Sequence, residues 1–336
     1  MEFVKRVFGF HKTPPVLVEC CLFELNCIVN NVIPPKGRRL NKRFNQMKNF
    51  LFGKGESEPE AEECEELAQE IINNDVILQI IRELPLLTVQ ERNSYVQVVA
   101  TLVSRDHAHF SSEYMVSEKG DEILSYVLEG LSDDDLSVHC GLFLRECVKS
   151  SPINNHILTT GPYLELLFTH YIFNARFDSC SDVLQVLCDL LRRNKQMVAV
   201  TLNADPDLCN KIFLWIRNLI QNGNYVVTRV IAHLLSLFLS DSVNLQITLR
   251  FLNDTENLMI VMNLLCSPYQ SIQLDAFDMF KLFAANTNGC VGVKMILRQN
   301  RAKLLSFLPN FLPHYEDDTF KKEKKIVLRL LSEKAL

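Results

Sequence analysis

The sequence predicts an all-α protein, and its hydrophobic content, its scarcity of turn residues and the spacing of its apolar segments all point to this fold class. The chain has 336 residues, of which 48% are hydrophobic. Its 11 glycines and 12 prolines are together about 7% of the chain, below the ~12% of average usage. So few turn residues argue against an all-β protein with many tight turns, and the hydrophobic content argues against disorder.

Residues 1–66 are expected to form an N-terminal helical cap with an acidic loop. Prolines and a glycine bracket a helix expected over Val16–Val32, and a basic amphipathic stretch follows over Arg38–Lys48. The acidic segment Gly55–Glu66 comes directly after it. We expect both charged blocks to be solvated. A nucleic-acid patch is the weaker interpretation of the basic stretch, because no series of aromatic residues interleaves it.

From Leu67 onward, amphipathic helical segments recur at a fixed distance. The repeated segments are Tyr95–Val103, Val138–Val148, Asp182–Leu191, Arg229–Leu239 and Ile272–Phe283. The reference positions within them are Ala100, Gly141, Val186, Ala232 and Ala276, which are 41, 45, 46 and 44 residues apart. Such a period is typical of HEAT and armadillo arrays, whose helical units bury their faces only by stacking. We therefore predict that residues 67–336 form one continuous armadillo/HEAT-like α-solenoid of about six degenerate helical repeats.

Short polar residues predict where several helices begin. Asp178 and Asn224 are expected N-caps, and the cluster Asp133–Asp135 is expected to lead into a helix from Leu136. Turn residues predict breaks at Asn203–Asp207, Asn222–Asn224 and Asn286–Gly289.

Charge and cysteine usage indicate the compartment and exclude some partners. The net charge of −5 does not match nucleic acid or an anionic membrane surface. The 11 cysteines are odd in number, form no C-x-x-C motif and mostly lie in apolar helical runs, so we expect small buried side chains in a reducing cytosol. Met1–Lys12 lacks an apolar core long enough for a signal peptide, and no run of 18 apolar residues predicts membrane insertion. A cytoplasmic location is expected.

Motifs for catalysis or cofactor binding are absent from the sequence. There is no P-loop, G-x-G-x-x-G, G-x-S-x-G or H-E-x-x-H motif. His107 and His109 are the only close pair of histidines, and we expect them in a polar loop rather than at a metal. The triplet Asp133–Asp135 lacks the glycine and glutamate of an EF-hand loop. We therefore expect no enzyme activity, no cofactor and no metal, and a protein that works as a binding surface.

The helix predicted over Tyr225–Leu239 has two different faces. At 100° per residue, one side is apolar and carries Val226, Val230, Leu234, Leu237 and Phe238. The other side carries Tyr225, Thr228, Arg229, Ala232, His233 and Ser236. Tyrosine and arginine often dominate interface energies, so this second side is a candidate binding face. Periodicity alone favours the alternative, in which Arg229 pairs with an acidic neighbour and Tyr225 packs across a loop.

Several strings, in one order along essentially the whole chain, resemble the calcium-binding protein 39 family, the Mo-type scaffold proteins of eukaryotic kinase complexes. The segment HCGLFLRECV around Leu144–Cys147 is similar to the NCG-x-x-LREC segment of that family. The other strings are Phe177–Asp182 (FDSCSD), Asn224–Arg229 (NYVVTR), Glu256–Leu265, Ile272–Asn286 and Gln299–Phe307.

The resemblance implies an armadillo-like, non-catalytic scaffold that binds sterile-twenty-type kinases and the STRAD pseudokinase and holds them in an active conformation. In that family a concave surface receives the kinase domain, with an aromatic residue before the FD-x-x-SD helix and a tyrosine and an arginine in NYV-x-x-R. The matching positions here are Phe177, Tyr225 and Arg229. The basic residue one turn after the arginine is His233 in this chain.

The resemblance also implies a pocket near the C-terminus that takes a short Trp-Glu-Phe-like tail. Met262 and Lys303 fit that pattern, whereas Leu245 stands in place of an aromatic residue and Ser242 in place of an arginine. These differences predict an altered affinity or motif preference. The family name suggests calcium, but no calcium loop occurs in this sequence and none is expected.

Two other classes of function stay open from the sequence. One is an armadillo-type adaptor for cargo or complex assembly, although the single tryptophan, Trp215, argues against the usual Trp and Asn ladder of that class. The other is an enzyme or regulatory subunit whose active site carries no recognisable motif. We expect a monomer in isolation.

Overall fold

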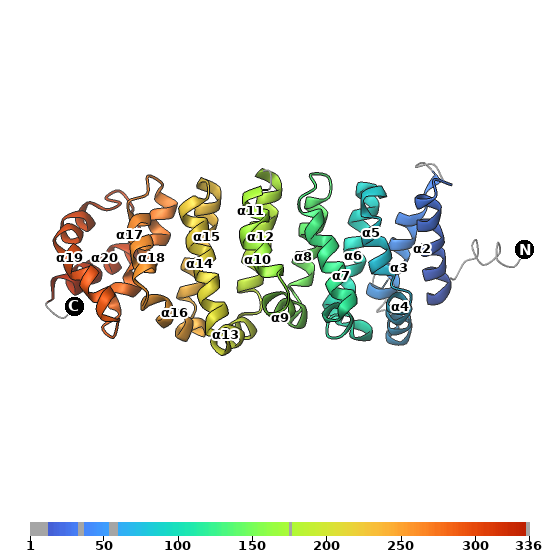
Figure 1. The fold of residues 1–336 in the computed structure, drawn as a ribbon, viewed down its shortest axis with the longest axis horizontal. Helices are drawn as coiled ribbons and strands as arrows, with labels where there is room; N and C mark the ends of the chain where they lie inside the picture. Colours follow the sequence, from blue (N-terminus) through green and yellow to red (C-terminus); the bar gives the residue numbers. More distant parts are fainter. Residues whose placement is uncertain (1–12, 33–36, 54–59, 175–176, 334–336) are drawn as a thin grey trace, which may run out of the picture. The chain divides into compact units, whose positions relative to one another are not determined.

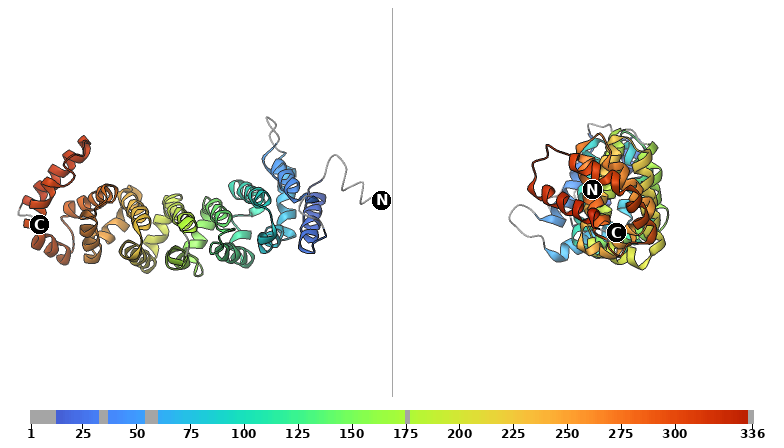
Figure 2. Two further views of the ribbon diagram at one scale, coloured as in Figure 1. Left: turned by 90° about the horizontal axis from the view of Figure 1, so that it is seen from above. Right: turned by 90° about the vertical axis from the view of Figure 1, so that its left-hand side faces the viewer.

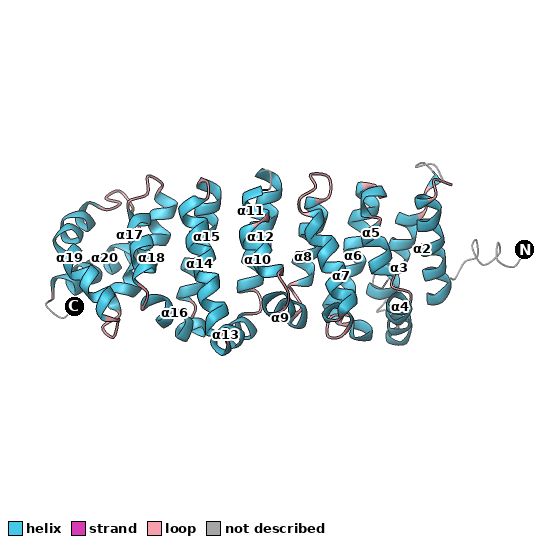
Figure 3. Ribbon diagram, viewed as in Figure 1, coloured by secondary structure: helices cyan, strands magenta, loops and turns pink. Residues whose placement is uncertain are grey.

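A computed structural model describes residues 13–32, 37–53, 60–174 and 177–333. Within these ranges there are 19 α-helices, several short 3₁₀ turns and no strand (Figure 3). The all-α prediction is therefore confirmed. The number of repeats and the boundary expected at residue 66 stay predictions.

The chain forms two compact units, which we call unit 1 (Met1–Asn194) and unit 2 (Lys195–Leu336). Figure 1 labels their helices. Unit 1 contains α2 (Pro14–Val29), α3 (Leu40–Phe52), α4 (Ala61–Asn73), α5 (Val76–Arg82), α6 (Val89–Arg105), α7 (Glu118–Gly130), α8 (Ser137–Cys147), α9 (Ser151–Thr159), α10 (Tyr163–Thr169), α11 (Tyr171–Asn174) and α12 (Phe177–Arg192). Unit 2 contains α13 (Lys195–Ala204), α14 (Pro206–Asn222), α15 (Tyr225–Ser240), α16 (Leu245–Leu252), α17 (Thr255–Leu265), α18 (Gln270–Ala285), α19 (Val291–Phe307) and α20 (Asp318–Ser332).

In unit 1, α3 and the three helices that carry the sequence repeat pack against one another in chain order. Helix α3 packs on α6, α6 on α8, and α8 on α12. The colours in Figure 2 follow the same order along the chain. The ring of Tyr95 on α6 lies 6.0 Å from Phe44 of α3 and 6.0 Å from Phe143 of α8, measured between centroids. All three rings are at most 1% exposed. The Tyr95 hydroxyl donates to the carbonyl oxygen of Ile77 at 2.9 Å, so its polar atom is satisfied inside the core.

Unit 2 is built in the same way around buried phenylalanines. Helix α15 packs on α18, and α18 packs on α17 and α20. The ring of Phe251 lies between Phe213 of α14, at 5.1 Å, and Phe283 of α18, at 5.8 Å. The ring of Phe277 contacts Phe320 of α20 at 4.8 Å. Aromatic contacts of this kind add to the free energy of burial and hold successive helices together.

Polar pairs join residues about one repeat apart, and we call them repeat-spaced pairs. They are Asp75–Lys119, Arg145–Asp189, His233–Asp275 and Lys281–Glu323, with sequence separations of 44, 44, 42 and 42 residues. Each pair connects two helices, or a helix and a loop, that are neighbours within one unit. Their separations agree with the period of the apolar segments, so the repeat organises the polar contacts as well as the core.

The predicted helix starts are partly confirmed. The side chain of Asn224 accepts hydrogen bonds from the backbone N–H groups of Val226 and Val227 and caps α15 as expected. Asp178, however, lies inside the first turn of α12, which begins one residue earlier. The cluster Asp133–Asp135 leads into α8 as expected, but the carboxylate of Asp133 accepts from the N–H of Asp135 and stabilises a turn before the helix. Each of the three predicted breaks contains a junction between helices, although the first overlaps the ends of α13 and α14 and leaves only Asp205 outside a helix.

The basic stretch after residue 37 is not simply a solvated face. Arg43 on α3 is 3% exposed and its guanidinium lies 3.8 Å from the carboxylate of Glu24 on α2. Arg38 lies 3.8 Å from Glu91, which completes a capping box with Thr88 at the start of α6. These arginines pair with carboxylates of helices α2 and α6, which the charge pattern alone did not identify. Part of the acidic segment lies outside the described residues.

The cysteines, all of which lie in described ranges, are free thiols, and eight of them are buried as expected. Burial raises the pKa of the Cys140 thiol to about 12. Cys266 is the exposed one.

No single helix of the described chain is both long and apolar enough to cross a membrane. A bent pair, Tyr225–Ser240 with Ser242–Leu252 at 78°, meets that criterion by length and composition alone.

Candidate protein-binding face and peptide pocket

A close backbone approach at Gly223 fixes the start of α15. Gly223 separates α14 from α15, and a Cβ atom at this position would lie 2.4 Å from the carbonyl oxygen of Leu219 and 2.7 Å from Val227. Only glycine fits such a close approach without displacing the backbone. Asn224 then caps the helix, and Tyr225 is its first residue.

The exposed face of α15 carries one aromatic and two basic side chains. Tyr225, Arg229 and His233 are all exposed and are spaced four residues apart, so they lie along one stripe of the helix. The predicted division of this helix is wrong at three positions. Leu237, expected on the apolar side, is 37% exposed. Ala232 and Ser236, expected on the other side, are 0% and 3% exposed. They are small, and helix α18 packs against α15.

Helix α18 contributes two further residues to this face. The ring of Tyr269, at the N-cap of α18, lies 4.2 Å from that of Tyr225, and both side chains remain more than 35% exposed. Nδ1 of His233 forms a hydrogen bond with the carboxyl group of Asp275 at 2.9 Å. Which of the two groups donates depends on their protonation. We call Tyr225, Arg229, His233, Tyr269 and Asp275 the α15–α18 face.

The charges of the α15–α18 face are unevenly balanced. Partial burial raises the pKa of the Asp275 carboxyl above its ordinary value, while His233 and Arg229 act in the opposite direction. Within the described part of the chain, Arg229 has no carboxylate within 4.0 Å, although it is close enough to act on Asp275 electrostatically. The positive charge of Arg229 is therefore exposed and only weakly compensated.

The alternative interpretation of α15, in which Arg229 pairs with an acidic neighbour and Tyr225 packs across a loop, is confirmed in part. Tyr225 does pack against another aromatic ring, at the start of α18, yet it stays 40% exposed. The contact with an acidic neighbour expected in that alternative is made by His233, with Asp275, and not by Arg229.

Phe177 is the first residue of α12 and belongs to unit 1. Its side chain lies outside the described residues, so its part in a binding face stays a prediction.

A cavity of about 220 Å³ lies between α17 and α19 of unit 2 and brings Met262 and Lys303 together. It is lined by Met262, Leu265, Cys266, Asn300, Lys303, Leu304 and Phe307. Four of these seven residues, Met262, Leu265, Leu304 and Phe307, have apolar side chains. Lys303 is the only charged residue of the seven. We call this cavity the tail pocket. It is smaller than the ~300–1,000 Å³ of pockets for drug-sized ligands, and its size suits one or two side chains of a peptide.

The tail pocket does not include the other two expected residues. Leu245, the first residue of α16, is 57% exposed and does not line the cavity. Ser242 lies in the short turn before α16 and is also absent from the lining.

Tyr269 and Asp275 were missed in the sequence, although a signal for both was present. Adding the repeat spacing of 44 residues to Tyr225 gives Tyr269, and adding 42 residues to His233 gives Asp275. Applying the period to exposed polar residues as well as to apolar ones would have found the neighbours of the face. For the tail pocket, Cys266 and Phe307 lie one helical turn from Met262 and Lys303 and share their helix faces.

Among the described residues, no group of three or more His, Cys, Asp or Glu side chains is placed to hold a metal ion.

Known proteins similar to this chain agree with the resemblance read from its motifs. The model of the Mo25-like family matches residues 8–333. A putative MO25-like protein of Arabidopsis thaliana is 31% identical over 292 residues, which cover 86% of this chain and 83% of that protein. The calcium-binding protein 39-like protein of Homo sapiens is 30% identical over 322 residues, covering 95% and 94% of the two chains. MO25-like protein 2 of Caenorhabditis elegans is 30% identical over 343 residues, covering 98% and 99%. With a family match from the first helices to the last and relatives of the same length, this chain belongs to the Mo25-like family.

Proposed function

We propose that this chain is a non-catalytic, cytoplasmic scaffold that binds protein kinases of the sterile-twenty type, or a STRAD-like pseudokinase complex, and activates them allosterically. The α15–α18 face would receive the kinase domain, and the tail pocket would receive a short C-terminal peptide of the partner. Membership of the Mo25-like family supports the general role, and the resemblance of the NYVVTR segment supports the choice of partner.

The observation that carries this proposal is the exposed arginine beside two exposed tyrosines on the α15–α18 face. Arginine and tyrosine are enriched among the residues that dominate binding energy, and a partner that covers them would gain apolar burial and a charge contact together. A carboxylate on the partner would meet Arg229 without first displacing an internal ion pair.

Activation follows if the face binds the active form of the kinase more tightly than the inactive form. A scaffold shifts a conformational equilibrium only by its difference in affinity for the two forms. A tenfold shift toward the active form requires about 1.4 kcal/mol, which one well-placed arginine contact can supply. No group on the scaffold has to form or break a bond.

The tail pocket would add affinity without choosing between kinase conformations. Its hydrocarbon walls suit an apolar side chain, and Lys303 suits a carboxylate at the end of the peptide or next to it. Because a tail and a kinase domain are covalently joined, binding at one site raises the effective concentration at the other.

The test of the kinase-binding face is Arg229→Ala. We expect it to weaken binding of a sterile-twenty-type kinase domain by ~2 kcal/mol or more and to reduce activation of the kinase, because the exposed cation is lost. Calorimetry measures the affinity, and circular dichroism and the melting point check that the variant is folded. Arg329→Ala, which removes an exposed arginine of α20 paired with Glu333, is the matched control and should bind normally. An unchanged affinity in folded Arg229→Ala would remove Arg229 from the site.

The test of the tail pocket is Met262→Ala. It should weaken binding of a peptide ending in Trp-Glu-Phe and leave binding of a tail-less kinase domain nearly unchanged, because the cavity would lose an apolar wall. Equal losses for both ligands would show that the two sites are not separable.

Cys266 offers an independent measure of tail-pocket occupancy. Its thiol lines the cavity and is exposed, whereas the other cysteines are buried or half-buried. Maleimide should label it first, and a bound tail peptide should slow that labelling. Phosphotransfer by the purified protein alone would contradict the non-catalytic part of the proposal.

A further inference from the structure

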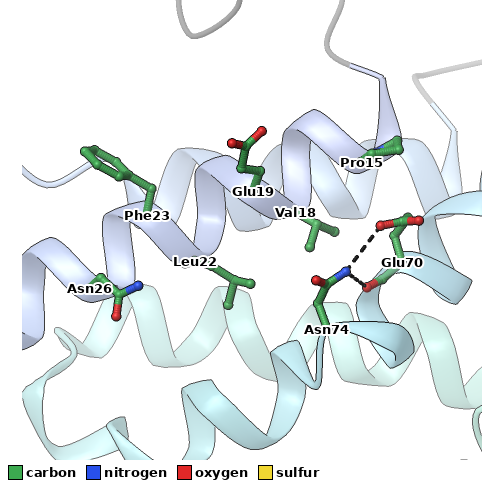
Figure 4. Close-up of a pocket in the computed structure, with 8 residues that line it drawn as sticks. All are labelled: Pro15, Val18, Glu19, Leu22, Phe23, Asn26, Glu70 and Asn74. Carbon is green, nitrogen blue, oxygen red and sulfur yellow. Dashed lines mark hydrogen bonds between the residues drawn. The ribbon is translucent and has the colours of Figure 1, made fainter. Parts of the chain in front are cut away.

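A second cavity, of about 430 Å³, opens on unit 1 where α2 passes the end of α4 (Figure 4). It is lined by Pro15, Val18, Glu19, Leu22, Phe23, Asn26, Glu70 and Asn74. We call it the α2–α4 pocket. It belongs to neither the α15–α18 face nor the tail pocket, and its volume lies within the range of pockets that bind ligands.

The floor and one edge of the α2–α4 pocket are apolar. In Figure 4, Val18 and Leu22 project from α2 toward the end of α4, and Phe23 projects further along the same helix. Phe23 is 53% exposed. An apolar side chain of a ligand would gain burial against these residues.

The charged groups that the described residues contribute to the α2–α4 pocket are all negative. Glu19 contributes a carboxylate from α2, and Glu70 contributes one from the last turn of α4. Asn74 caps that turn, where its amide donates to the carbonyl oxygen of Glu70 at 2.9 Å and to the Glu70 carboxylate at 3.2 Å. The C-terminal end of a helix carries a partial negative charge, which adds to that of the two carboxylates. Among the described residues that line the pocket, none is Lys, Arg or His.

We propose that the α2–α4 pocket binds a peptide segment of a partner protein in which a lysine or arginine lies next to a large apolar side chain. The apolar residue packs on Leu22 and Phe23, and the cation lies between the carboxylates of Glu19 and Glu70. The charge complementarity selects a basic peptide and disfavours an acidic one. This site is independent of the kinase-binding function proposed above.

The experiment measures binding of a fluorescein-labelled peptide, Gly-Phe-Lys-Leu-Arg-Phe-Gly, to the full chain by fluorescence anisotropy. We expect saturable binding that weakens as sodium chloride is raised, since the rim charges are screened by salt. The acidic peptide Gly-Phe-Glu-Leu-Asp-Phe-Gly should bind at least tenfold more weakly.

Two variants test whether the peptide binds in the α2–α4 pocket. Glu19→Lys should lower the affinity about fivefold or more, because it reverses a rim charge. Phe23→Ser should lower it by a similar factor through lost apolar contact. Glu165→Lys makes the same change of charge on α10, away from the pocket, and Arg229→Ala alters only the α15–α18 face; both should bind the peptide as the unchanged chain does.

Three results would overturn the proposal. The first is equal affinity for the acidic and basic peptides, and the second is undiminished binding by folded Glu19→Lys and Phe23→Ser. The third concerns residues 1–12, whose sequence itself combines phenylalanines with Lys5 and Arg6. If the peptide binds only after these residues are deleted, the pocket serves the chain's own N-terminal segment and not a partner.

Discussion

Helices α8 and α15 hold corresponding places in the repeat, yet their arginines are used in opposite ways. On α8, in unit 1, Arg145 donates from Nε to the carboxylate of Asp189 on α12 at 2.8 Å, and His139 is 6% exposed. On α15, in unit 2, Arg229 has no such partner among the described residues, and the side chain of His233 is 59% exposed.

This difference separates two uses of one scaffold. The Arg145–Asp189 pair joins α8 to α12 and leaves little charge free for another molecule. On α15 the polar contact with α18 is made by His233 and Asp275, so that Arg229 is left at the surface beside Tyr225. Substitutions should therefore affect stability at α8 and binding at α15, and the predictions below are ordered by the size of that effect.

The largest expected effect is that of Gly141→Leu on α8. A Cβ atom at Gly141 would lie 2.9 Å from Cβ of Asp182, so a longer side chain has to push α8 away from α12. Overpacking of this kind costs roughly 1–3 kcal/mol in the free energy of unfolding. Chemical denaturation measures it. Gly289→Leu is the control, because a Cβ atom there meets its neighbours at 3.4 Å or more, and an equal loss in both variants would mean that the close approach of α8 and α12 is unimportant.

On α15, replacing the paired tyrosines should affect binding and not folding. We expect Tyr225→Ala and Tyr269→Ala each to weaken binding of the kinase domain by about 1–2 kcal/mol. Their unfolding free energies should change by less than about 0.5 kcal/mol, since both rings lie at the surface. The double variant should lose less than the sum of the two single losses, because the rings contact each other. A large drop in melting point with unchanged kinase binding would contradict the proposal that the exposed residues of α15 serve binding and not stability.

The buried histidine of α8 should make stability depend on pH. Burial, together with the nearby guanidinium of Arg92, lowers the pKa of His139 below its ordinary value of 6.5. The unfolded chain then takes up the proton first, so this contribution to stability is intact above pH 6.5 and is lost as the pH falls below it. The melting point should fall between pH 7.5 and 5.5, and it should fall less in His139→Gln. Parallel curves for the two proteins would exclude His139 as the cause.

Asp275 on the α15–α18 face should give a smaller dependence of the opposite sign. Because burial raises the pKa of its carboxyl above 3.8, the folded chain binds the proton more tightly than the unfolded chain. The contribution to stability is therefore present at low pH and declines as the pH rises through the raised pKa. Asp275→Asn should have the melting point of the original chain near pH 3 and a slightly higher one at pH 7. A lower melting point at pH 7 would mean that the contact with His233 outweighs the cost of burial.

The regular parts of this fold could be predicted from the sequence because they depend on local patterns. The helical segments, the break at Gly223 and the Asn224 cap follow from apolar periodicity and from the hydrogen bonds that a short side chain can make. Asp178 was misplaced because cap residues are also common within a first turn, where a carboxylate is equally suited to the helix dipole.

The contacts between helices could not be predicted from local patterns. Amphipathicity shows which side of α15 is apolar, but it does not show that Ala232 and Ser236 lie where another helix approaches. In the same way, Arg43 and Glu24 have the charges of surface residues, and only the packing of α2 on α3 buries them. For the candidate site, Met262 and Lys303 could be paired through the resemblance to a family. Leu245 could not, since its place depends on how α16 leaves the preceding turn.

The repeat-spaced pairs have a consequence for insertions and deletions. One residue added within α15, between Arg229 and His233, would rotate the following part of the helix by about 100° and turn His233 away from Asp275. One residue added in the loop after Ala285 would leave both side chains of that pair where they are. Changes in chain length are therefore tolerated between the helices and penalised inside them, and loop length is the dimension along which a protein of this architecture can vary most freely.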